Sequence, residues 1–135
     1  MSGIVNDKSF EIIFRDGRTH SVWLDKPVSD VTIQALYDLL CLGPTSANSS
    51  PARFLFLRSP EAKERLRPHL SAGNLEKTMS APIVAIVGYD LAFCDKFDVL
   101  WPGNDQVRGW FAGNDEKLLE TAFRNGSLHG AYMII

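Results

Sequence analysis

Two apolar segments of this 135-residue chain are typical of buried strands, and this small number constrains the fold more than any other feature. Residues 54–57 (FLFL) form a continuous apolar run, and residues 83–89 (IVAIVGY) are rich in β-branched side chains. Such runs predict strands that are covered on both faces. Two strands are too few for a stable sheet. The missing strands must come from a lost C-terminal segment, from a partner subunit or from weaker segments of this chain.

The segments around these strands have helical patterns. Ser29 or Asp30 can cap one helix, and Asn114 or Asp115 can cap another. Ser59-Pro60 is a typical helix start. Apolar spacing predicts helices over 7–15, from 29 or 30 to 42, over 60–67, over part of 90–101 and from 115 onward. The polar stretch 71–82 predicts one helical turn, and 102–115 predicts a long irregular loop. Helices around two strands indicate a single α/β or α+β domain over residues 1–135.

Composition argues against several classes of protein. Lys and Arg total 14 against 16 Asp and Glu, and no basic block occurs, so nucleic acid binding has little electrostatic support. No apolar run is long enough to span a bilayer, and the N-terminus lacks a signal-peptide pattern, so a cytoplasmic location is expected. The histidines show no metal-binding spacing. Cys41 and Cys94 predict two reduced, mostly buried thiols rather than a disulfide.

The end of the sequence, GSLHGAYMII, lies in the middle of an apolar helical pattern. No glycine, proline or polar cap follows this pattern, although domains usually end after a capped element. We therefore expect the sequence to be a fragment of a longer chain.

Three polar clusters are candidates for binding. The first is GRTHS, 17–21, where an arginine could form a two-pronged bond to a phosphate. The second is GPTSANSSP, 43–51, a longer junction between helix and strand than a turn requires. The third is GNLEKT, 73–78, in which Asn74 and Lys77 lie one helical turn apart. Taken alone, each cluster is better explained as an ordinary surface loop or turn.

Signatures of side-chain catalysis are absent from the sequence. It contains no G-x-S-x-G elbow, no phosphate-binding P-loop and no G-x-G-x-x-G. A hydrolase that uses a serine from 45–50 remains an alternative, but no activating base is indicated for it.

Taken together and in this order, the three clusters resemble the FMN-dependent nitroreductase family, and more closely its malonic semialdehyde reductase branch. The matching stretches include RTHSVWLDKPVSD, GPTSANSSPARF and ETAFRNGSLHGAY, and the resemblance covers nearly the whole chain from residue 10 onward. It implies an α+β fold with a central, mainly antiparallel sheet flanked by helices. Residues 1–135 would be the N-terminal two-thirds of the family domain. The resemblance also implies homodimers with FMN at the subunit interface.

The resemblance implies roles for individual residues. Arg18 matches the arginine that holds the FMN phosphate, with Thr19 and His20 beside it. Asn74 matches the asparagine at the pyrimidine edge of the flavin, and Lys77 matches a lysine near that edge. The loop residues Pro44, Thr45, Ser46 and Asn48 match those that reach the flavin of the partner subunit.

One departure from the family pattern is that Val22 stands where many relatives have a lysine near the flavin N1 and O2. Charge at that position would then be stabilised by Lys77 or by main-chain N–H groups. Trp110 and Phe111 are candidates for a wall or lid of the substrate pocket, and two core anchors are the alternative.

The resemblance further implies ping-pong hydride transfer from NADPH or NADH, with chemistry at the flavin N5 and no catalytic side chain. The implied acceptor is malonic semialdehyde, reduced to 3-hydroxypropanoate in pyrimidine breakdown, with nitroaromatics or quinones as further acceptors. A flavin-binding module without turnover, or a truncated one, is the alternative.

Overall fold

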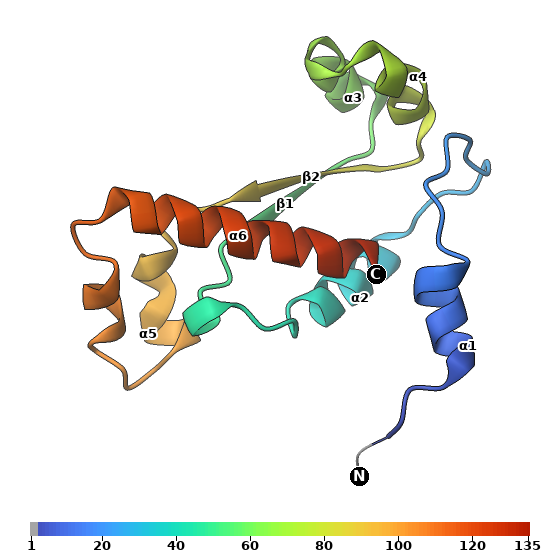
Figure 1. The fold of residues 1–135 in the computed structure, drawn as a ribbon. Coiled ribbons are helices and arrows are strands. Elements are labelled where there is room, and N and C mark those ends of the chain that lie inside the picture. Colours follow the sequence, from blue (N-terminus) through green and yellow to red (C-terminus); the bar gives the residue numbers. More distant parts are fainter. Residues whose placement is uncertain (1–2) are drawn as a thin grey trace.

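The two strands expected from the sequence form one antiparallel pair in the computed structural model, which describes residues 3–135 (Figure 1). Strand β1 (Ala52–Leu57) pairs with β2 (Val84–Tyr89), with Ala52 opposite Tyr89 and Leu57 opposite Val84. The helices around this pair are α1 (Asp7–Phe10), α2 (Asp30–Leu40), α3 (Pro60–Leu66), α4 (Ala72–Ser80), α5 (Phe97–Leu100) and α6 (Asp115–Ile134). The predicted α+β class is confirmed.

Shorter helical turns connect these elements. A π-helical turn, Glu11–Arg15, continues α1, and 3-10 turns cover Ser46–Asn48, Arg67–His69, Phe93–Lys96 and Val107–Trp110. The segment 102–115, predicted to be irregular throughout, therefore contains one of these turns.

Three helices begin where side-chain caps were predicted. The hydroxyl of Ser29 accepts a hydrogen bond from the Thr32 N–H, and the hydroxyl of Ser59 accepts one from the Ala62 N–H. The amide oxygen of Asn114 accepts from the Lys117 N–H. Each bond satisfies one of the N–H groups that lack a partner at the start of a helix, which is why these residues mark the boundaries.

Helix α4 is longer than the single turn that its polar sequence predicts. It covers the nine residues Ala72–Ser80 and packs against α3. A cation from α3 satisfies its C-terminal end: Lys63 Nζ donates to the carbonyls of Met79 and Ala81, 2.9 Å from each oxygen. Helix C-termini leave carbonyl groups unpaired, so this tertiary contact stabilises a helix of modest propensity.

Helix α6 crosses one face of the strand pair, as Figure 1 shows. Small residues permit the close approach that the sequence indicated. A Cβ atom on Gly126 would lie 3.0 Å from the Cβ of Tyr89, and one on Gly130 would lie 3.7 Å from Cγ1 of Val87. Helix and strand therefore pack almost backbone to backbone along this face.

The main apolar core lies at the N-terminal half of α6. It consists of Phe93, Phe97, Val107, Phe111 and Ala122. The Phe93 and Phe111 rings meet edge to face with centroids 5.2 Å apart, a favourable aromatic geometry. The segment between α5 and α6 thus supplies two core residues despite its irregular sequence.

The strand pair is not covered on both faces within this chain, contrary to the prediction. Leu55 is 58% exposed and Ile86 is 36% exposed. The thiol prediction is also only partly right, because both cysteines are free but Cys41 is exposed. Across residues 3–135, no helix has the length and apolar character to cross a membrane.

Candidate functional site

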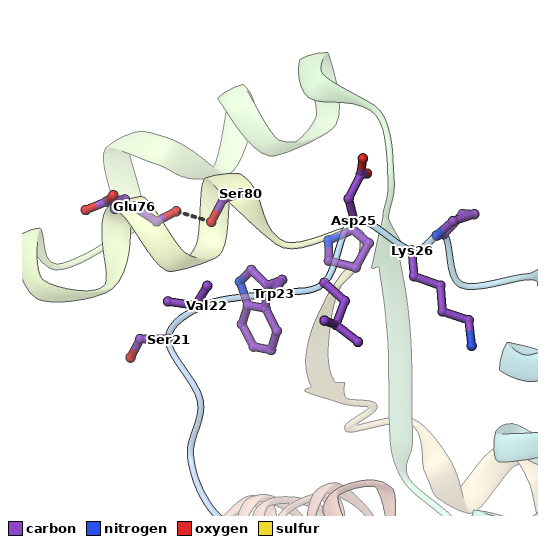
Figure 2. Close-up of a pocket in the computed structure, with 10 residues that line it drawn as sticks. Ser21, Val22, Trp23, Asp25, Lys26, Glu76 and Ser80 are labelled. Atoms are coloured by element: carbon purple, nitrogen blue, oxygen red, sulfur yellow. Dashed lines mark hydrogen bonds between the residues drawn. The ribbon is translucent and has the colours of Figure 1, made fainter.

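An open cleft of about 600 Å³ lies between the extended segment 21–27 and helix α4 (Figure 2). The residues that line it are Ser21–Pro27, Glu76, Ser80 and Pro82. The indole N–H of Trp23 donates to the carbonyl of Lys77, with the two atoms 2.6 Å apart. The bond joins residues 54 positions apart and satisfies a carbonyl in the last turn of α4. It brings two of the three predicted polar clusters into one neighbourhood.

Arg18 lies just before this segment, at the end of the N-terminal helix. Its Nη1 donates to the main-chain carbonyls of Arg15 and Gly17, at 2.7 Å from each oxygen. Within residues 3–135, no carboxylate forms an ion pair with Arg18. A guanidinium has five N–H donors, so Nε and Nη2 are free to bind an anion. The side chain is held in place while its charge is not neutralised.

The neighbours of Arg18 are exposed and lead into the cleft. Thr19 and His20 are exposed. His20 lines a second hollow, which shares Val22, Trp23 and Leu24 with the cleft. Val22 is 86% exposed and lines the cleft itself. This end of the cleft therefore combines hydroxyl, imidazole and apolar groups.

Asn74 and Lys77 both belong to α4, which borders the cleft. Asn74 is exposed, and its main-chain N–H donates to the Ser71 carbonyl at 2.9 Å. Its amide side chain makes no hydrogen bond within residues 3–135. Lys77 is half-buried, and its carbonyl receives the Trp23 bond. The spacing of three residues places the two side chains on one side of the helix.

The third cluster, the loop 43–51, lies elsewhere. It precedes β1, whereas α3 and α4 follow the other end of that strand, and Figure 1 shows the two regions far apart. The loop is held by a bond between its own residues and by a bond to α5. Thr45 Oγ1 accepts from the Ser50 N–H at 3.1 Å, and the Asn48 amide donates to the Leu100 carbonyl. The structure therefore does not bring this loop to Arg18 or Asn74 within one chain.

Three polar residues of α6 contact this loop and were not identified as functional from the sequence. Asn125 Oδ1 accepts from the Ser46 N–H at 2.8 Å, and the Tyr132 hydroxyl donates to the Pro44 carbonyl at 3.2 Å. His129 is 3% exposed. Burial lowers the pKa of His129, and a main-chain interaction with Gly43 partly opposes this effect. The signal in the sequence was polar residues spaced at one helix face, 125, 129 and 132.

The two candidate wall residues have different environments. Trp110 is 48% exposed and packs edge to face on Trp101, with ring centroids 5.7 Å apart. Phe111 is 4% exposed and lies in the core. Phe111 therefore occupies the position of a core anchor, while Trp110 presents a free aromatic face.

The chain is similar to known proteins in both sequence and structure. No protein-family model matches the chain. It is 54% identical over 131 residues to a protein of Burkholderia lata with the provisional name NADH dehydrogenase/NAD(P)H nitroreductase; the match covers 97% of this chain and 67% of that protein.

Solved structures of low sequence identity share the fold. A provisionally named nitroreductase of Exiguobacterium sibiricum in complex with FMN has a TM-score of 0.78 at 19% identity, over 92% of this chain and 66% of that one. A nitroreductase family protein of Streptococcus pneumoniae has a TM-score of 0.78 at 17% identity, over 92% and 68%. The provisionally named nitroreductase ydfN of Bacillus subtilis has a TM-score of 0.73 at 19% identity, over 95% and 69%. The chain spans about two thirds of the length of each relative, and it belongs to the nitroreductase family.

Proposed function

We propose that this chain is the FMN-binding part of an NAD(P)H-dependent oxidoreductase and that residues 1–135 correspond to the N-terminal two-thirds of its domain. The observation that carries the proposal is the guanidinium of Arg18, which has no ion pair within residues 3–135 and precedes a cleft bordered by α4, the helix that carries Asn74 and Lys77. The Burkholderia relative named as an NAD(P)H nitroreductase and the FMN-bound Exiguobacterium neighbour support the same cofactor and co-substrate class.

The donors near the cleft fit the chemical groups of FMN. A phosphate needs cationic and hydroxyl donors, which Arg18, Thr19 and His20 provide. The pyrimidine edge of a flavin has both donors and acceptors, which suits the amide of Asn74 and the ammonium of Lys77. The apolar side chains of Val22 and Trp23 provide contact area for a planar ring.

When bound, FMN supplies hydride chemistry between NAD(P)H and a second substrate at its N5 position. In the proposal, the task of the protein is to hold the phosphate, orient the ring and leave one face of it open to both substrates. No side-chain nucleophile is needed, in agreement with the absence of any nucleophile motif in the sequence.

The proposed acceptor is malonic semialdehyde, reduced to 3-hydroxypropanoate in pyrimidine breakdown. Nitroaromatics and quinones are proposed as further acceptors, because an open flavin face tolerates many of them. The support for the aldehyde is the resemblance of the sequence to that branch of the family. Trp110, with its exposed ring, is the proposed aromatic wall of the acceptor site.

We further propose a homodimer in which the loop residues Pro44, Thr45, Ser46 and Asn48 contact the flavin of the partner subunit. Two observations support it: the loop lies away from α4 within one chain, and apolar side chains on α2 and α6 are exposed. Leu39 is 69% exposed and Phe123 is 57% exposed. Exposed apolar surface of this kind is typical of an interface.

The test is an anaerobic titration of the full-length, FMN-loaded protein with NADPH and, separately, NADH. Loss of the visible flavin absorbance supports the reductase, and its recovery on adding malonic semialdehyde supports the proposed acceptor. Recovery with a nitroaromatic alone would retain the reductase and reject the aldehyde. A yellow protein that neither nucleotide bleaches would instead be a flavin-binding module without turnover.

A further inference from the structure

One face of α6 holds the loop 43–48 through side-chain contacts with its main chain. Asn125 accepts from the Ser46 N–H at 2.8 Å and also donates from Nδ2 to the Thr121 carbonyl at 2.8 Å, so both ends of its amide are bonded. Tyr132 donates to the Pro44 carbonyl at 3.2 Å, 88 residues away in sequence. The amide fixes one end of the loop and the phenol fixes the other.

His129 lies between these two residues on the same face. Its ring centroid is 5.9 Å from that of Tyr132, and its Nε2 is buried without a hydrogen-bond partner within residues 3–135. The Tyr132 ring covers Gly43 so closely that a Cβ there would lie 2.1 Å from Cε2. The glycine is therefore required by the aromatic ring, and the loop and the helix are fitted to each other.

The backbone of the loop has a conformation that the loop alone would not favour. Ala47, Asn48 and Ser50 have φ values of 54°, 50° and 38°, in the left-handed region that residues other than glycine rarely adopt. Such residues persist when the surrounding structure determines their conformation, and they are concentrated at ligand-binding sites. From outside the loop, α6 contributes the Asn125 bond to Ser46, the residue that precedes Ala47. Asn48 and Ser50 are held by bonds to the Leu100 carbonyl and to Thr45.

We infer that Asn125 and Tyr132 are positioning residues that hold the loop 43–48 in the conformation with which it contacts FMN. The inference rests on the proposed function, because it assumes that the loop meets the flavin of the partner subunit. Neither side chain is required to touch the cofactor. They act through the main chain of Pro44 and Ser46, and so they determine where Thr45, Ser46 and Asn48 present their polar groups.

The test uses Asn125→Ala and Tyr132→Phe in the full-length protein. Each has a matched control. Asn114→Ala removes the N-cap of the same helix, and so destabilises α6 without touching the loop. Tyr89→Phe removes a phenol hydroxyl on β2 that makes no hydrogen bond within residues 3–135.

The first measurement is the Kd for FMN from quenching of flavin fluorescence. We expect it to rise about fivefold in Tyr132→Phe and about tenfold in Asn125→Ala, with little change in either control. The second is visible circular dichroism at saturating FMN, which should change in the two test variants only. The third is hydrogen exchange of the Ser46 amide without FMN, which should accelerate in Asn125→Ala and not in Asn114→Ala.

The outcomes separate this inference from the proposed function. If wild-type protein binds no FMN, both the proposed function and the inference fail. If wild-type protein binds FMN but Asn125→Ala and Tyr132→Phe bind it with unchanged affinity and dichroism, the inference alone fails. If Asn114→Ala weakens binding as much as Asn125→Ala, helix stability explains the effect and positioning is rejected.

Discussion

The role of Arg18 leads to a prediction that can be worked out from its hydrogen bonds. Nη1 is already occupied by the carbonyls of Arg15 and Gly17, so Nε and Nη2 can form two parallel bonds to phosphate oxygens. Bonds to charged groups contribute about 1.5–3 kcal/mol. Because the guanidinium is exposed and screened by salt, we take a value near 2 kcal/mol. Arg18→Ala should then raise the Kd for FMN about 30-fold.

The assay compares FMN with riboflavin, which has the same ring and no phosphate. Wild type and Arg18→Ala are each titrated with both ligands and followed by fluorescence. The difference between the binding free energies of FMN and riboflavin gives the contribution of the phosphate. Riboflavin affinity should be nearly unchanged, because the missing guanidinium has no phosphate to bind. Arg18→Lys keeps the charge but not the fork and should give an intermediate Kd for FMN.

Arg15→Ala is the matched control, since Arg15 pairs with Glu11 one helical turn earlier. Its main-chain carbonyl, which Arg18 uses, remains in the variant. Equal losses for FMN and riboflavin in Arg18→Ala would refute the assignment, because the residue would then act on the ring or on the fold. An unchanged Kd for both ligands would refute it as well.

Three further predictions concern the cleft and its supports. Trp23→Phe deletes the bond to the Lys77 carbonyl and should lower the free energy of unfolding by about 1 kcal/mol and weaken FMN binding. Trp110→Phe is the control, because the indole N–H of Trp110 makes no hydrogen bond within residues 3–135, and it should change neither quantity. Equal effects of the two substitutions would contradict this role of Trp23. Lys63→Met leaves two carbonyls at the end of α4 without their donor. The substitution should lower the free energy of unfolding, measured in urea, by about 2 kcal/mol. A change within experimental error would show that water replaces the ammonium. The pKa of His129 is lowered from its ordinary value of 6.5, so the unfolded chain takes up a proton first as the pH falls. Stability should therefore decrease as the pH falls below about 6.5, by at most about 1.4 kcal/mol per unit, until the folded-state pKa is reached. His129→Gln should reduce this dependence, as followed by urea unfolding between pH 5 and 8, and an unchanged dependence would contradict the assignment to His129.

Local chemistry made some parts of the fold predictable from sequence. Ser29, Ser59 and Asn114 cap helices through bonds to residues three positions away, so a short window of sequence contains the whole interaction. The extent of α4 was underestimated because its stability comes from elsewhere. Lys63 and Trp23 satisfy its terminal carbonyls from distant positions, and no pattern within 71–82 reports that contact.

The candidate site shows the same division between local and distant information. Arg18 could be picked out because an arginine in a polar loop is a recognisable anion binder. Asn125 was missed because its partner Ser46 is 79 residues away, so no short stretch of sequence contains both partners. The Thr45 hydroxyl was expected to face a ligand, yet it accepts from the Ser50 N–H within the loop. Residue type predicted that this loop is polar, but not which of its groups are used internally.

The position of the polar clusters along β1 bears on how a complete site could form. The loop 43–51 ends where β1 begins, and α3 and α4 follow its far end. A six-residue strand is about 20 Å long, which is longer than a flavin ring system. A ring that contacts Asn74 and Lys77 therefore cannot also contact Ser46 and Asn48 of the same chain. If both clusters serve one flavin, as proposed, two copies of the chain must supply them. A loop that is rigid within each subunit needs no reordering when the copies meet. The contacts of Asn125 and Tyr132 would provide that rigidity within each subunit.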